Sequence, residues 1–159
     1  MATNGVLIQP QDSRHFFMLP QAPGDAGYYV YGTPPHGAGQ YAHPAMISML
    51  LFVEREWAAI DNRKFGVGNI SLAGGAHFVP HSTHKNGLEV DIRPLRKDGR
   101  EDPVTWHQHD VYDRVGTAKL IAVFHAYPGV QQILFNDTSI PFVNPCINHD
   151  NHFHVHLRP

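Results

Sequence analysis

Cysteine is nearly absent from this sequence: Cys146 is the only one among 159 residues. A single cysteine excludes an intramolecular disulfide and a cysteine-rich zinc finger. Long apolar runs are absent as well, because the most apolar stretch, residues 46–53, stops at Glu54 and falls short of the roughly 18 residues that span a membrane. We therefore expect no membrane partner.

Charged residues are also few, and neither sign dominates. Asp, Glu, Lys and Arg make up 16% of the chain, and the formal net charge is −2. Because there is no run of basic residues, we expect no positive electrostatic potential that would attract nucleic acid, and therefore no nucleic-acid partner. Residues 1–14 lack the charged start and the apolar stretch of about 7–15 residues that a secretory signal needs, which predicts a chain without a signal peptide.

Helix and strand patterns predict one α+β domain over residues 1–159, with residues 1–42 as a loop-rich part packed on it. The length fits a single domain, which usually has about 100–200 residues. The expected elements are, in chain order, strand 28–31, helix 44–60, strands 65–72 and 88–92, a helix within 111–127, and strands 131–135 and 152–158. This order, with short connections, favours a central antiparallel sheet flanked by helices.

Apolar residues at helical spacing identify the face of each helix that we expect in the core. A helix in a small domain buries one apolar stripe and leaves the opposite side to solvent. The expected stripes are Met46, Leu50, Val53, Trp57 and Ile60 in the first helix, and Val115, Leu120, Val123 and Phe124 in the second.

Histidine is the residue type in surplus, with 13 copies against 14 for Asp and Glu together. Many of the potential metal ligands lie in two segments, residues 81–92 and 149–156. His84 is expected in a turn and Asp91 on the strand that follows, and Gly87 lets the chain fold back between them. A lone carboxylate within an apolar strand is costly unless it is paired or bound to a metal.

The last strand is the expected source of a third ligand. Alternation along residues 152–158 points His152 and His154 to one side and Phe153 into the core. Zinc favours imidazole nitrogen with carboxylate oxygen, and a catalytic zinc site has three protein ligands and one open position. The two segments therefore predict a zinc site on the sheet.

These residues resemble a known group of zinc proteins, which contains lysostaphin, the D-Ala-D-Ala carboxypeptidases and Sonic hedgehog. The shared pattern is a histidine followed by an aspartate seven positions later, as in His84 and Asp91, and then a His-x-His sequence. Within the group the chain is most similar to the penicillin-insensitive murein endopeptidases. Four segments in family order carry the resemblance: His43-Pro44, residues 68–71 before a glycine pair, residues 81–92, and residues 149–155.

The resemblance implies a function and a set of roles. The family hydrolyses peptide cross-links between the stem peptides of peptidoglycan, in the periplasm or cell wall. His152 would act as general base, and His81 and His149 would lie beside the metal and steer water or substrate charge. One zinc ion per chain would be held by His84, Asp91 and His154.

Several departures from the family pattern leave alternatives open. His156 stands where the family usually has arginine, and Asn151 stands where the carboxypeptidase branch has its glutamate base. The alternatives are a D,D-carboxypeptidase or amidase acting on cell-wall fragments, and a non-catalytic hedgehog-like zinc module. A wall hydrolase without a signal peptide would be delivered by phage lysis or by injection as an antibacterial effector with an immunity or delivery partner, unless its signal has been lost.

Overall fold

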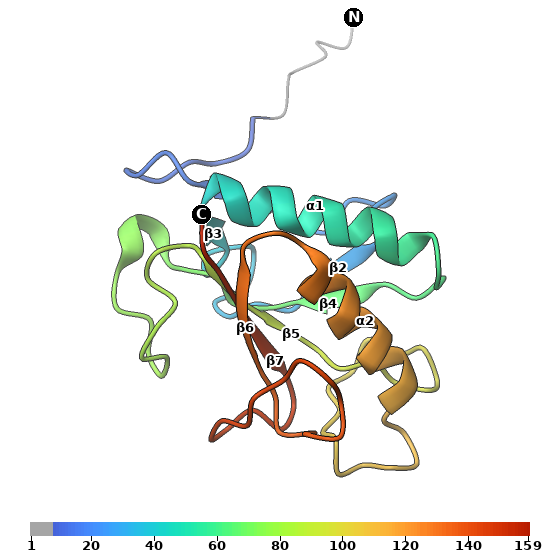
Figure 1. Ribbon diagram of the computed structural model, residues 1–159. Helices are drawn as coiled ribbons and strands as arrows, with labels where there is room; N and C mark the ends of the chain where they lie inside the picture. The colour runs from blue at the N-terminus through green and yellow to red at the C-terminus, as the bar shows by residue number, and fades with distance from the viewer. Residues whose placement is uncertain (1–7) are drawn as a thin grey trace, which may run out of the picture.

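A five-stranded sheet lies at the centre of the fold, and two helices pack on one of its faces (Figure 1). The computed structural model describes residues 8–159. Across the sheet the strands are β2 (Tyr28–Val30), β4 (Phe65–Val67), β5 (Glu89–Ile92), β7 (Phe153–Leu157) and β6 (Val130–Leu134). A separate two-stranded sheet pairs β1 (Phe17–Met18) with β3 (Tyr41–Ala42), and a short 3-10 helix, η1, covers Ala73–Gly75.

The α+β class is confirmed, but the sheet is mixed and not wholly antiparallel. The pairs β4–β5, β5–β7 and β7–β6 are antiparallel, whereas β2 and β4 are parallel. A parallel pair needs a crossover of a dozen or more residues, usually through a helix. Residues 31–64, which contain β3 and the first helix, provide this crossover.

Helix α1 covers Pro44–Ala58, two residues shorter than expected. The amide of Ala45 donates to Nδ1 of His43 at 3.0 Å, so His43 caps the helix, and Pro44 occupies the first turn, where its missing N–H costs nothing. Ile60 lies beyond the end of the helix and is 61% exposed, so its assignment to the core was wrong. The buried residues of α1 are Met46, Met49, Leu50, Val53 and Trp57.

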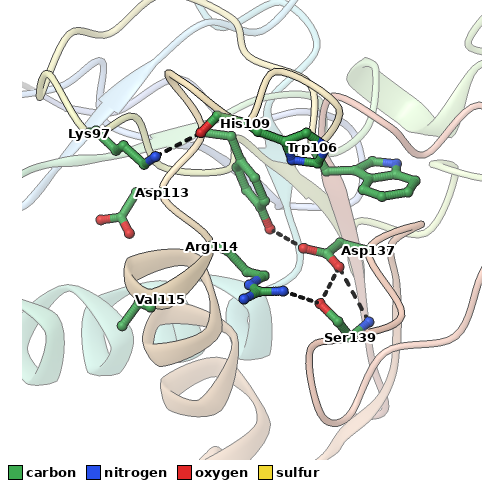
Figure 2. Close-up of a pocket in the computed structure, with 9 residues that line it drawn as sticks. Lys97, Trp106, His109, Asp113, Arg114, Val115, Asp137 and Ser139 are labelled. Carbon is green, nitrogen blue, oxygen red and sulfur yellow. Dashed lines mark hydrogen bonds between the residues drawn. The ribbon is translucent and has the colours of Figure 1, made fainter.

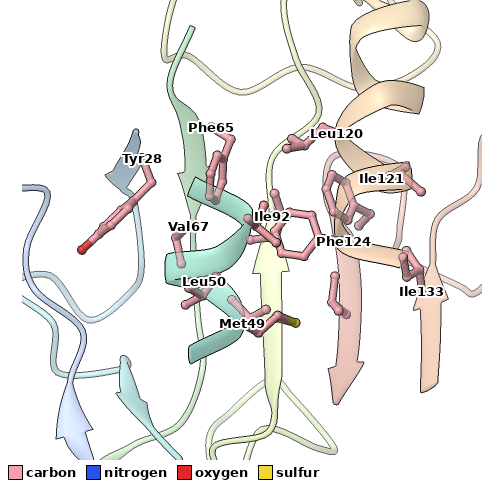
Figure 3. Packing of buried hydrophobic residues seen from close by; sticks show 14 of the residues in the cluster. Tyr28, Met49, Leu50, Phe65, Val67, Ile92, Leu120, Ile121, Phe124 and Ile133 are labelled. Atoms are coloured by element: carbon pink, nitrogen blue, oxygen red, sulfur yellow. The ribbon is translucent and has the colours of Figure 1, made fainter. Parts of the chain in front are cut away.

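Helix α2 covers Arg114–Ala126 and starts where Asp113 accepts a hydrogen bond from the Gly116 amide at 3.0 Å. Val115 therefore lies in the first turn and is 64% exposed, contrary to the expected stripe. The buried face of α2 consists of Gly116, Thr117, Leu120, Ile121 and Phe124. Figure 3 shows Leu120, Ile121 and Phe124 packed against the sheet beside Phe65 and Ile92.

One hydrophobic cluster joins both helices to the sheet, so residues 8–159 form a single domain. Within this part of the chain, no helix is long and apolar enough to cross a membrane. The core side of β5 and β7 carries Val90, Ile92, Phe153 and Val155, all of them at 0% exposure. The opposite side of the same two strands carries polar residues, and the pairing of Asp91 with His154 brings the two predicted metal-binding segments together.

Candidate metal centre

The carboxylate of Asp91 is the centre of the site. Asp91 lies on β5 and is only 5% exposed. One of its oxygens, Oδ1, lies 3.2 Å from Nε2 of His84, 3.1 Å from Nδ1 of His154 and 3.7 Å from Nε2 of His152. Three imidazoles from two distant segments of the chain therefore converge on a single oxygen atom.

His84 is held in one orientation by the turn that carries it. Its backbone has a φ of 61°, its amide donates to the Glu89 carboxylate, and its ring Nδ1 lies 2.9 Å from the carbonyl oxygen of Ile70. Because a carbonyl can only accept, Nδ1 carries a proton, and in the neutral ring Nε2 then presents its lone pair. That lone pair faces Asp91.

His154 approaches the same oxygen from β7, which pairs with β5. Its Nδ1 lies beside Asp91, and its Nε2 lies 3.9 Å from Oε1 of Glu89, which is itself buried at 6% exposure. Nδ1 is therefore the ring nitrogen of His154 that a metal ion bound to Asp91 would meet. Glu89 was missed in the sequence, although it alternates with Asp91 and thus lies on the same face of the strand.

The pKa shifts of Asp91 and His84 indicate that a cation fits between their side chains. Burial on its own raises the pKa of Asp91, but the hydrogen bonds from His154 and His84 outweigh it and hold that pKa well below its usual range. Burial lowers the pKa of His84, yet the Asp91 carboxylate reverses this and raises it above the ordinary value. Neutral His84 and ionised Asp91 would direct lone pairs at each other over 3.2 Å, so a proton or a metal ion has to lie between them.

His81 completes a cluster that could hold a metal ion. Ligand atoms of His81, His84 and Asp91 all lie within 4.8 Å of one another. Asn69, on the other side of His81, places its Nδ2 at 2.8 Å from the His81 Nε2. The Asn69 amide is oriented by the Thr33 backbone N–H, which donates to Oδ1 at 2.7 Å, so Nδ2–H points at His81 and Nε2 of that ring is the acceptor.

His152 and His149 lie at the rim of this group. Nδ1 of His152 lies 2.8 Å from Oδ1 of Asn151, so it carries the proton and Nε2 is the basic atom that faces Asp91. Burial lowers the pKa of His152 to about 4, although the charge of Asp91 acts in the opposite direction. The ring of His149 lies 4.7 Å from that of His152 and 5.8 Å from that of His154. All six histidine and aspartate side chains that the sequence predicted for the site are thus gathered at one place.

An anchor that the sequence did not reveal holds the loop carrying His81 and His84. Arg14 donates to the backbone carbonyl of Lys85 at 2.6 Å and to that of Leu72 at 3.0 Å. Its guanidinium is held in turn by Asp12, whose Oδ2 lies 2.6 Å from Nη2. The N-terminal part of the chain therefore fixes both ends of the segment that contains the two histidines.

A cavity of about 320 Å³ opens beside Asp91, and the residues of its far wall were also missed in the sequence. Asp91 of β5 meets residues from the segments that follow β2, β4 and β5 and from the loop that leads into β7. The cavity is lined by Tyr31, Thr33, Asn69, His81, Asp91, Arg93, Pro103, Asn151 and His152. His81, Asp91 and His152 thus lie on the wall of a space in which a substrate group can reach them.

A second cavity, of about 480 Å³, lies at the start of α2 (Figure 2). Its polar groups already bind one another: the Tyr112 hydroxyl donates to Asp137 at 2.8 Å, and Ser139 donates to the same carboxylate. Trp106 connects it to the site, because its indole N–H donates to Asp150 at 2.9 Å. The Trp106 contact ties the 149–152 loop to this region, and among the described residues the cavity contains no cluster of metal ligands.

Comparison with known proteins adds no further identification. No model of a protein family matches the chain, and no curated protein sequence matches it significantly. The candidate metal centre therefore depends on the geometry of these residues and on the motifs that carry the resemblance.

Proposed function

We propose that this protein is a zinc-dependent endopeptidase that hydrolyses peptide cross-links of bacterial peptidoglycan. The observation that supports this most is the convergence of His84, His154 and His152 on one oxygen of the buried Asp91 carboxylate. Two imidazoles and a carboxylate are a usual ligand set for catalytic zinc, and a neutral histidine next to them is a suitable base. The place of action would be the cell wall.

His84, Asp91 and His154 are the ligands that we propose. His84 and His154 both direct a ring nitrogen at Asp91, with Ile70 and Glu89 on the far side of each ring. His81 is the less suitable ligand, because its Nε2 accepts from the Asn69 amide and its Nδ1 carries the proton in the neutral ring. We therefore assign His81 a role toward substrate.

When bound, zinc would supply a Lewis acid that polarises the scissile carbonyl and makes water nucleophilic near neutral pH. The chain contributes the proton transfers. Nε2 of His152 is unprotonated at neutral pH, because burial holds its pKa at about 4, and it faces the proposed zinc ligands. It would take a proton from the attacking water and return it to the leaving amine as the C–N bond breaks.

His81 and His149 would act on charge that develops during the reaction. His81 lines the cavity, and its Nδ1–H is a donor able to stabilise the oxyanion of the tetrahedral intermediate. His149 is exposed at the rim, where its Nδ1 lies 2.8 Å from the carbonyl of Ile147. That contact orients the ring toward His152 and the entering substrate.

The alternatives differ from this proposal in the bond cleaved or in the absence of catalysis. A non-catalytic zinc module would have no need for His152, which is partly buried and neutral and directs its Nε2 at the proposed metal position. A carboxypeptidase with a glutamate base is disfavoured, because Asn151 cannot take a proton and serves to orient His152. The residues of the site fit an amidase as well as an endopeptidase.

Digestion of purified sacculi tests the proposal. The zinc-loaded protein should convert cross-linked muropeptide dimers to monomers, leave the glycan chains intact and be insensitive to penicillin, since no active-site serine takes part. Mass spectrometry of the fragments identifies the new termini. Release of D-Ala alone would indicate the carboxypeptidase, and release of stem peptides from muramic acid would indicate the amidase. No product at all would indicate the non-catalytic module.

A further inference from the structure

Arg93 lies directly after β5, and within the described part of the chain no carboxylate is paired with its charge. Arg14, Arg63, Arg96 and Arg100 each form an ion pair with an aspartate. Among residues 8–159, no carboxylate forms an ion pair with Arg93. Its one hydrogen bond goes from Nη1 to the backbone carbonyl of Glu101 at 2.7 Å, which leaves most of the five N–H donors of the guanidinium for a ligand.

The position of Arg93 is fixed by the aromatic ring beneath it. The guanidinium carbon lies 3.9 Å from the ring centroid of Tyr31, a cation–π contact. The ring can lie there because the residue that follows β4 is Gly68: a Cβ at that position would be 2.6 Å from Cζ of Tyr31. A charge held in this way has lost its side-chain freedom before any ligand arrives, which favours tight binding.

Tyr31 adds a second sign that a ligand belongs in this cavity. Its hydroxyl is the one buried side-chain nitrogen or oxygen within residues 8–159 that has no hydrogen-bond partner. Unpartnered buried polar groups are rare and usually have a functional reason. Both Arg93 and Tyr31 line the cavity that also contains Asp91, His81 and His152.

We propose that Arg93 binds a carboxylate of the substrate close to the scissile amide. Arg93 follows Asp91 by two residues along the strand direction, a separation of about 7 Å, so an anion on Arg93 lies within one residue of the scissile amide. A guanidinium matches a carboxylate with two parallel hydrogen bonds. This inference rests on the proposed function and narrows it: the preferred substrate is a cross-link that carries a free carboxylate next to the cleaved bond.

The test compares two cross-linked dimers that differ only in this group, as a free carboxylate or as a carboxamide. Both kcat/KM in the zinc-loaded protein and Kd in zinc-loaded His152→Ala are measured for the two dimers. We expect the free carboxylate to be preferred about 10–100-fold in both measurements, which is the range for a charge-assisted pair. Arg93→Gln should abolish the preference by weakening the carboxylate dimer alone, with zinc content unchanged, and Arg93→Lys should restore part of it.

The outcomes separate this inference from the proposed function. Hydrolysis of both dimers at equal rates would overturn the role of Arg93 and leave the endopeptidase standing. Preferential binding without hydrolysis would support Arg93 and overturn the endopeptidase. An Arg93→Gln variant that weakens both dimers equally would show a purely structural role through Tyr31 and Glu101, and failure of both dimers to bind would overturn the carboxylate site whatever the protein cleaves.

Discussion

The side chains of Asp12 and Asp91 are buried to a similar degree, with 1% and 7% of their surface exposed. Asp12 accepts five hydrogen bonds, three from Arg14 and one each from the amides of Phe16 and Gly74. Asp91 is surrounded by imidazoles, and within residues 8–159 no guanidinium or ammonium is paired with it. The two carboxylates are thus equally removed from water and differ in what compensates their charge.

The nature of that compensation separates a structural carboxylate from a functional one. Burial raises the pKa of Asp12, but the hydrogen bonds of Arg14 and the backbone outweigh it and lower the pKa to about 2. A guanidinium never gives up its proton in a protein, so Asp12 has a permanent partner. An imidazole releases its proton near neutral pH, so the partners of Asp91 can exchange a proton for a metal ion.

Substitution of Asp91 should have the largest effect. Asp91→Asn removes the charged ligand, so we expect the zinc content to fall from about one per chain to near zero and turnover to fall by at least about 10³-fold. Elemental analysis after dialysis and the dimer assay measure the two effects. Asp12→Asn is the matched control, because it removes an equally buried carboxylate and should retain zinc. An Asp91→Asn protein that binds zinc like the parent would show that Asp91 is not a zinc ligand and does not differ from Asp12 in this respect.

Substitution of His152 should separate catalysis from metal binding. His152→Ala should retain zinc and lose about 10²–10⁴-fold in turnover, which is the usual contribution of a positioned general base. His156, two residues beyond His154 on the same strand, provides the control, and His156→Ala should leave both quantities near those of the parent. If His152→Ala loses its zinc, His152 is a ligand, and the base has to be sought at His149 or His81.

Substitution of Asp12 should affect stability and not chemistry. We expect Asp12→Asn to lower the free energy of unfolding of the metal-free protein by about 1.5–3 kcal/mol at pH 7, the range for hydrogen bonds to charged groups. The pKa of Asp12 in the folded protein, about 2, is below its ordinary value of 3.8, so this stability is present above pH 3.8 and is lost as the pH falls through 2.

Urea unfolding of parent and variant across this pH range provides the measurement, with Asp25→Asn as the control at an exposed carboxylate. The difference between parent and Asp12→Asn should shrink between pH 4 and pH 2. A difference that persists at pH 2 would mean that the charge of Asp12 is not what stabilises the anchor.

The parts of the molecule that the sequence predicted are those that depend on local pattern. Apolar spacing identified both helices, and alternation identified β7 together with the side of it that carries His154. Residue chemistry then selected His84 and Asp91, because few side chains bind zinc. Apolar spacing alone was not sufficient for Val115. It predicted this residue in the core, but the helix cap at Asp113 sets the start of α2 and leaves Val115 exposed.

The parts that the sequence did not predict depend on which strands are neighbours. Tyr31 and Arg93 are far apart in the chain and meet because β4 pairs with both β2 and β5, and because Gly68 leaves room for the ring. Periodicity predicts that a strand exists and which residues share a face, but it does not predict the adjacent strand. The contacts of Asn69 with His81 and Thr33 were hidden for the same reason.

The central claim is that the polar side of β5 and β7 holds one zinc ion that the protein uses to hydrolyse peptide cross-links. Its most direct test is a titration of the metal-free protein with zinc while conversion of a cross-linked dimer to monomers is followed. We predict that the rate of dimer hydrolysis rises in proportion to the zinc added and levels off at about one equivalent per chain. Absence of hydrolysis at every zinc concentration, or the same rate with and without zinc, would contradict it.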